Sequence, residues 1–153
     1  MEDSNQKKDI AKVKNEDVVQ QESKSKDELP PKPIKPEEKP FDEFINLHLI
    51  PTLKSSLEEL NCSITEIIYK QGQRPVTGDN SWNIICKFDN DRTFCLSFSK
   101  QEIKSEKTIV LSEPGSEPSL LESFLIDEKK TTLSLIVSRI LQRLNGQKWL
   151  GAN

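Results

Sequence analysis

The sequence predicts an α+β fold, in which a four-stranded antiparallel sheet carries an N-terminal and a C-terminal helix on one face. Apolar residues recur with a helical period near both ends of the predicted domain, and the segment between them changes to a period of two, which is typical of strands. A run of strands flanked by helices favours an antiparallel sheet covered on one side over a parallel βαβ arrangement.

The start of the 153-residue chain differs in composition from the rest. Residues 1–39 hold nine Lys, ten Asp or Glu and no aromatic residue, so they have too little apolar surface to offset their chain entropy. We predict a disordered charged tail over 1–39 and a single α+β domain over 40–153. Prolines crowd residues 29–40, which favours an extended spacer, with a PxxP ligand as the functional alternative.

The first helix is predicted from an apolar stripe with a helical period. Pro51 lies inside this stripe, where its ring would clash with the carbonyl of Leu47. The helix is therefore expected to be kinked near Pro51 or split into two short helices. The stripe consists of Phe41, Phe44, Ile45, Leu49, Leu53, Leu57 and Leu60.

Strands are expected at 64–69, 82–88, 93–98 and 108–111, and the middle two form the best-determined hairpin. Turn residues at 89–91 close it and set its register. Three apolar pairs on one face indicate the core side of the sheet. Cys95 then points to the other face from Cys86, which argues against a disulfide between them. The expected pairs are Trp82 with Phe98, Ile84 with Leu96, and Cys86 with Phe94.

The second helix has the clearest apolar stripe in the chain. Asp127 is its predicted N-cap, and Asn145 with Gly146 is its predicted stop. A surface loop at 113–119 and a short apolar connector at 120–126 are expected before it. The stripe consists of Leu133, Ile136, Val137, Ile140, Leu141 and Leu144.

Charge and composition argue against several classes of function. The net charge is −3, and neither the tail nor the domain carries the basic stripe on which nucleic-acid binding depends. The sequence has no apolar run long enough to span a membrane and no secretory signal region. Its three cysteines match no zinc or redox spacing, which favours a reducing compartment.

The sequence also shows no recognisable group of catalytic residues. The five glycines form no phosphate-binding loop, and neighbouring acidic residues diverge on a helix instead of converging. The one histidine, His48, is interpreted as a boundary residue of the first helix, although it is the only candidate base near neutral pH. We therefore expect a protein without enzymatic activity, metal or cofactor.

Two segments are candidates for binding other molecules. Trp149 and Leu150 follow the predicted helix stop, and this apolar pair must either fold back on the domain or dock on a partner. The loop at 72–81, which contains Arg74, is long enough for a functional loop, although most loops of this length are simply surface.

Three segments resemble a cyanobacterial and chloroplast family that is associated with the NdhV subunit of the photosynthetic NAD(P)H dehydrogenase-like complex. They are KPFDEFI at 39–45, FLIDEKKTTL at 124–133 and LQRLNGQKWLG at 141–151. The resemblance implies an auxiliary subunit without cofactor or small-molecule substrate. It also implies a place on the cytoplasmic face of the thylakoid, in the peripheral arm near the ferredoxin-docking region of a complex that passes electrons from ferredoxin to plastoquinone.

Partner-contacting residues follow from expected exposure alone. Arg139, Arg143, Lys148 and Trp149 are the candidates, and the three basic residues are expected to form a cationic edge that meets an acidic partner surface. Two other functions stay open: an assembly or maturation factor for a thylakoid complex, and a small enzyme.

Overall fold

The computed structural model describes residues 34–118 and 120–150. From Lys35 onward these residues belong to one compact α+β unit, which begins upstream of the predicted domain start at Pro40. The rest of the predicted tail, 1–33, lies outside the described residues. The elements in chain order are η2 (Pro36–Glu38), α2 (Phe41–Glu43), η3 (Phe44–Leu49), α3 (Ile50–Glu59), β1 (Ile64–Gln73), β2 (Asn80–Phe88), β3 (Thr93–Phe98), β4 (Lys107–Ser112), β5 (Glu122–Phe124) and α4 (Leu133–Gly146).

The N-terminal helical segment accommodates Pro51 by changing its helix type. The six residues of η3 form a π-helix, in which the Ile50 N–H donates to the Ile45 carbonyl five residues earlier. This wider winding ends at Leu49, and Pro51 then stands in the first turn of α3. The chain therefore continues through Pro51 as α3 after a π-helical stretch.

The central hairpin has the predicted register. Cys86 faces Phe94 across β2 and β3, and the other two predicted pairs, Trp82 with Phe98 and Ile84 with Leu96, are also formed. Cys95 pairs with Ile85, so the two cysteines lie on opposite faces of the sheet. The three predicted pairs in this hairpin are confirmed.

The prediction of four strands is wrong, because the sheet has five in the order β1-β2-β3-β4-β5. The additional strand, β5, lies in the segment that was predicted to be an apolar connector. It pairs over three residues with the start of β4, from Lys107 to Ile109. A strand of this length shows too little alternation to be recognised in the sequence, and its pairing with β4 defines it.

Helix α4 begins later than predicted, because its N-cap is Thr132 instead of Asp127. The Thr132 hydroxyl accepts from the Leu135 N–H at 3.1 Å. A second acceptor comes from far along the chain, since the Glu37 carboxylate accepts from the Leu133 N–H at 2.7 Å. Two free amide groups at the helix start thus have partners, and one partner lies in a segment predicted to belong to the tail.

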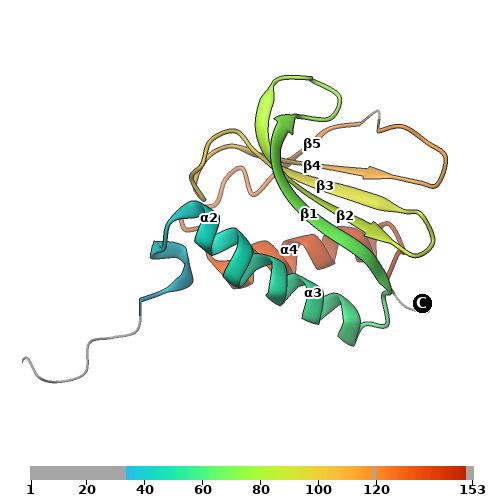
Figure 1. Ribbon diagram of the computed structural model, residues 1–153, viewed down its shortest axis with the longest axis horizontal. Helices are drawn as coiled ribbons and strands as arrows, with labels where there is room; N and C mark the ends of the chain where they lie inside the picture. The colour runs from blue at the N-terminus through green and yellow to red at the C-terminus, as the bar shows by residue number, and fades with distance from the viewer. Residues whose placement is uncertain (1–33, 119, 151–153) are drawn as a thin grey trace, which may run out of the picture. The chain divides into compact units, whose positions relative to one another are not determined.

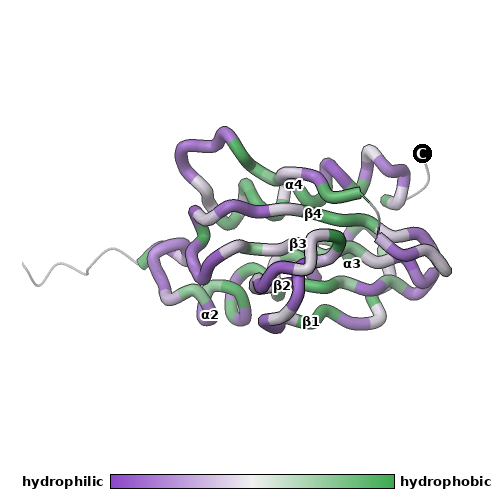
Figure 2. Tube along the Cα trace, turned by 90° about the horizontal axis from the view of Figure 1, so that it is seen from above, coloured by the Kyte–Doolittle hydropathy of each residue, from purple (hydrophilic) through white to green (hydrophobic). Residues whose placement is uncertain are grey.

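Helices and sheet share one hydrophobic core. Figure 1 shows α3 and α4 next to each other on one side of the sheet. Buried side chains of both helices and of the facing side of β2, β3 and β4 form a single cluster. In Figure 2, green stretches run through the helices and strands, whereas many of the connecting loops are purple. Phe44, Leu57, Ile84, Phe94 and Ile140 are completely buried in this core.

Candidate functional site

The predicted partner-contacting residues lie on the last turns of α4 and just beyond it. Arg143 makes a two-pronged contact with Glu122 of β5, in which Nε and Nη2 donate to the carboxylate at 2.7 and 2.6 Å. These hydrogen bonds hold the pKa of Glu122 below its ordinary value and raise that of Arg143. Arg143 also donates to the Gln147 side chain at 3.1 Å. Its guanidinium is therefore fixed in place.

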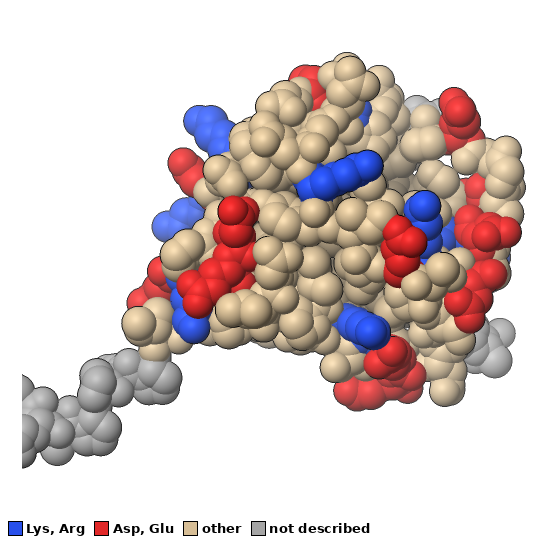
Figure 3. Space-filling model, viewed as in Figure 1, with Lys and Arg blue, Asp and Glu red and all other residues tan. Residues whose placement is uncertain are grey.

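Arg139 is likewise paired, with Glu128 at 3.0 Å. Each arginine of the predicted cationic edge thus has a carboxylate from the segment before α4 beside it. Lys148 is exposed. In Figure 3, blue side chains are scattered over the visible face and do not gather into one area, whereas several red side chains lie close together along its right edge. The two arginines of the predicted cationic edge are thus held in ion pairs within the chain, Arg143 with Glu122 and Arg139 with Glu128.

Trp149 folds back on the domain, which is the first of the two alternatives for this residue, the other being docking on a partner. Its indole N–H donates to the Glu113 carboxylate at 2.9 Å, and this bond is the main reason that the pKa of Glu113 is lowered. The ring meets Phe88 edge to face at 6.0 Å, with the Arg92 guanidinium 5.3 Å from its centre. With 8% of its surface exposed, Trp149 serves as an anchor inside the chain.

A turn at the end of α4 brings Trp149 to this position. The Trp149 N–H donates to the Leu144 carbonyl, and Lys148 adopts a left-handed conformation with φ of 64°. This arrangement is a Schellman-type ending, in which a glycine usually holds the left-handed position. The helix ends at Gly146, which together with Asn145 was the predicted stop, and Gln147 is the C-cap.

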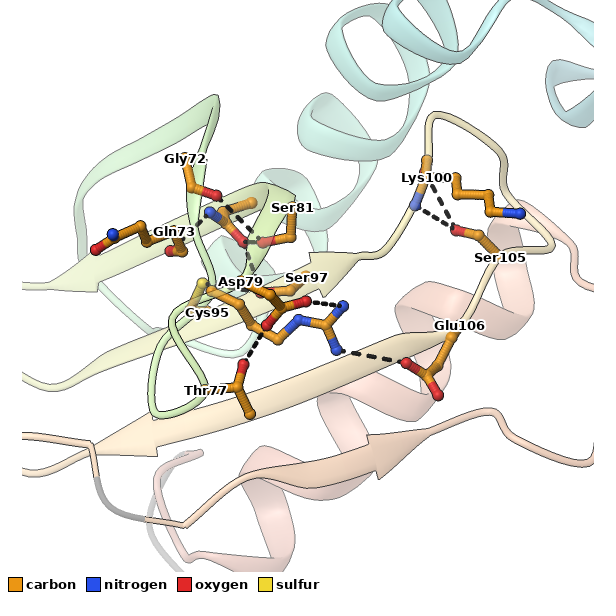
Figure 4. A network of polar contacts seen from close by, with 12 residues as sticks. Gly72, Gln73, Thr77, Asp79, Ser81, Cys95, Ser97, Lys100, Ser105 and Glu106 are labelled. Carbon is orange, nitrogen blue, oxygen red and sulfur yellow. Dashed lines mark hydrogen bonds and ion pairs between the residues drawn. The ribbon is translucent and has the colours of Figure 1, made fainter.

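The face of the sheet away from the helices carries a buried polar network (Figure 4). The Asn83 side-chain oxygen accepts from the hydroxyls of Ser81 and Ser97 at 2.7 and 2.6 Å. Its amide nitrogen donates to the Gln73 carbonyl at 3.3 Å. The hairpin rule that predicted the apolar pairs also pairs Asn83 with Ser97, so the sequence contained a signal for this network.

Arg74 lies within the predicted 72–81 loop and is buried at its base. Its guanidinium reaches Asp79 at 3.2 Å and Glu106, just before β4, at 3.6 Å. The Nε hydrogen of Arg74 has no acceptor within the described part of the chain. The loop is thus tied to the sheet by a buried cation, which indicates a structural role for Arg74.

Groups suited to nucleophilic chemistry are scattered. Burial raises the pKa of the Cys86 thiol to about 12 and also raises that of Cys95. Such thiols carry little thiolate near neutral pH and are poor nucleophiles. Among the described residues, no cluster of three His, Cys, Asp or Glu residues suits a metal ion, and no helix is long and apolar enough to cross a membrane.

Two large apolar side chains that flank β5 in the sequence are exposed. Leu120 and Ile126 are 67% and 72% exposed, and they lie two residues before Glu122 and Glu128, the partners of the two arginines. A shallow pocket of about 280 Å³ separates β5 from α4 at this place. We name this region the α4–β5 surface, and it consists of Leu120, Glu122, Ile126, Glu128, Arg139 and Arg143.

Comparison with known proteins gives one family. A family model described as "Protein of unknown function (DUF2996)" matches residues 35–151. The matched region starts where the compact unit starts, at Lys35. No curated protein matches the chain.

Proposed function

The chain belongs to the DUF2996 family, and we propose that it is a non-catalytic auxiliary subunit of the thylakoid NAD(P)H dehydrogenase-like complex. It stabilises the peripheral arm of this ferredoxin-plastoquinone oxidoreductase near the ferredoxin-docking region, on the cytoplasmic face of the membrane. The α4–β5 surface is the part that contacts a neighbouring subunit.

The exposure of Leu120 and Ile126 is the observation that supports a protein interface at this surface. Exposed large apolar side chains and arginines are both typical of protein interfaces, in which a desolvated centre is surrounded by polar contacts. Both arginines are already held by carboxylates, so little side-chain entropy is lost when a partner covers them.

The segments that resemble the NdhV-associated family also support this surface. The segment at 124–133 supplies Ile126 and Glu128, and the segment at 141–151 supplies Arg143. Strand β5, which shares Phe124 with the first of these segments, lies at the edge of the sheet. This edge strand has three residues, and short edge strands reduce unwanted pairing with the strands of other chains.

A native gel of gently solubilised membranes tests the proposal. The wild-type chain should migrate with a large complex, and a Leu120→Asp, Ile126→Asp variant should be released from it because a charge replaces each exposed apolar side chain of the proposed interface. Leu47→Asp is the matched control, since Leu47 is 61% exposed but lies on η3. Migration of the wild type as a free 17.5 kDa protein would contradict the proposal.

Pulse-chase labelling separates a lasting subunit from an assembly or maturation factor. A subunit stays in the mature complex throughout the chase, whereas an assembly factor associates only with incomplete complexes and then leaves. Loss of the labelled chain from mature complexes would replace the subunit proposal with the assembly proposal.

A further inference from the structure

A second pocket beside β5, of about 360 Å³, lies between the start of β4 and the segment that leads to α4. Its volume falls within the range of small-molecule sites. Three lysines line it: Lys104 before β4, Lys107 at the first position of β4, and Lys129 on the approach to α4. Lys104 and Lys129 are exposed, whereas Lys107 is 4% exposed. The pocket therefore has a buried ammonium and two exposed ones.

Lys107 has few partners for a buried charge. Its ammonium donates to the Ser105 carbonyl at 2.8 Å and lies 5.9 Å from the centre of the Phe98 ring. Within the described part of the chain, no carboxylate lies within ion-pair distance of it. An ammonium carries three donors, and burial without a counterion is costly. Desolvation accordingly lowers the pKa of Lys107.

The acidic residues of the pocket are committed to arginines. Glu106 pairs with Arg74 at 3.6 Å, and Glu128 pairs with Arg139 at 3.0 Å. Lys104 and Lys129, in contrast, form no ion pair with any described residue. The three ammonium groups thus give the pocket a positive charge that the described chain does not balance locally.

We propose that this pocket binds a small anion through a phosphate or carboxylate group, with Lys107 as the buried contact and Lys104 and Lys129 at the rim. The anion supplies the counterion that Lys107 lacks and accepts its remaining hydrogen bonds. An adjoining pocket of about 300 Å³ shares Lys104 and Thr131, and its other lining residues are Phe41 and Ile103 together with Glu37, Lys39, Gln101 and Glu102. This inference concerns the isolated chain and does not depend on the proposed subunit function.

NMR spectroscopy of the isolated full-length chain with labelled lysine side chains tests the proposal. Sodium phosphate and sodium succinate are the probes, and sodium chloride keeps the ionic strength constant. The Lys107 signals should shift with saturation on addition of at least one probe. The probe that binds more tightly identifies the charged group of the anion as phosphate or carboxylate. If neither probe shifts Lys107 more than chloride does, the proposal is overturned.

Variants locate the binding site. Lys107→Met keeps the apolar stem and should weaken binding about tenfold or more, since a hydrogen bond to a charged group is lost. Circular dichroism shows whether this variant folds. If it does not, the Lys104→Gln, Lys129→Gln variant changes exposed residues alone and should weaken binding severalfold. Lys54→Gln on exposed α3 surface is the matched control, and an equal loss of affinity in this control would contradict the site.

Discussion

Both faces of the sheet contain fully buried side chains, but the chemistry of these side chains differs. On the helix side, Phe94 and Leu96 are completely buried among other apolar side chains. On the opposite side, Ser81 and Ser97 are 0% and 1% exposed, and Asn83 is 2% exposed. Burial of apolar side chains stabilises the fold whatever the orientation of their neighbours. A buried polar group, in contrast, requires a hydrogen-bond partner at a defined position.

This difference determines how each face responds to change. The helix side loses stability in proportion to the volume that is removed, because neighbouring side chains relax only partly into a cavity. The opposite side loses stability according to how many donors and acceptors are left without partners. Asn83 is the centre of that side, since one oxygen serves two hydroxyl groups.

The largest effect is expected from Phe94→Ala on the helix side. Phe94 is fully buried and lies 6.1 Å from Phe88, so its truncation leaves a large cavity. Chemical denaturation should show a loss of about 3–5 kcal/mol in the free energy of unfolding. Leu47→Ala, at a position 61% exposed, is the control and should change stability by less than about 0.5 kcal/mol. Equal losses in both variants would show that the helix side is not the main core.

Asn83→Ala tests the polar side. It removes the acceptor of the Ser81 and Ser97 hydroxyls and leaves Ser81 only the Gly72 carbonyl at 3.5 Å, so a loss of about 1–3 kcal/mol is expected. In a Ser81→Ala, Ser97→Ala background the same change should cost less, because the two orphaned donors are gone. A double-mutant cycle by urea denaturation measures this coupling. Strict additivity would mean that the network does not act as a unit.

Arg74→Met should have a smaller effect than Asn83→Ala. The change removes two ion pairs whose carboxylates are 53% and 70% exposed and therefore screened by water. It also removes an Nε hydrogen that has no acceptor among the described residues, while the apolar stem is kept. Thermal unfolding at low and high salt measures the loss. A larger loss than that of Asn83→Ala would identify Arg74 as the main support of this face.

The smallest effect is expected at the edge of the sheet, in the pair between Glu122 and Arg143. The pKa of Glu122 is lowered in the folded chain from its ordinary value of 4.5. The contribution of the Glu122–Arg143 pair to stability is therefore fully present at a pH above the ordinary pKa of Glu122. It is lost as the pH falls through the lower pKa of Glu122 in the folded chain. Solvent screening limits it to about 0.5 kcal/mol. Glu122→Gln should remove this part of the acid sensitivity in unfolding curves measured from neutral to acid pH, and an unchanged pH profile would contradict it.

Local patterns in the sequence were sufficient for part of this structure. The register of the β2–β3 hairpin follows from its turn and its alternation, and all three predicted apolar pairs are present. The apolar stripe of α4 likewise supplies the buried residues Ile136, Ile140 and Leu144. These features depend on neighbours in sequence, which periodicity describes well.

Other features were missed because their partners come from distant parts of the chain. Strand β5 forms by pairing with β4, and the start of α4 depends on Thr132 together with Glu37. The candidate site residues were chosen by expected exposure. That criterion placed Arg139 correctly on the surface, but it could not show its pairing with Glu128 or the burial of Trp149.

By itself, the sequence determined the α+β class, the helix stripes and the central hairpin, since each follows from a repeat of two or 3.6 residues along the chain. Tertiary structure alone decided which polar groups are buried, which charges are paired, and that the buried ammonium of Lys107 has no carboxylate of the described chain within ion-pair distance. Hydrogen bonds and ion pairs depend on distances of a few ångströms between residues far apart in sequence, and only the packed chain sets those distances.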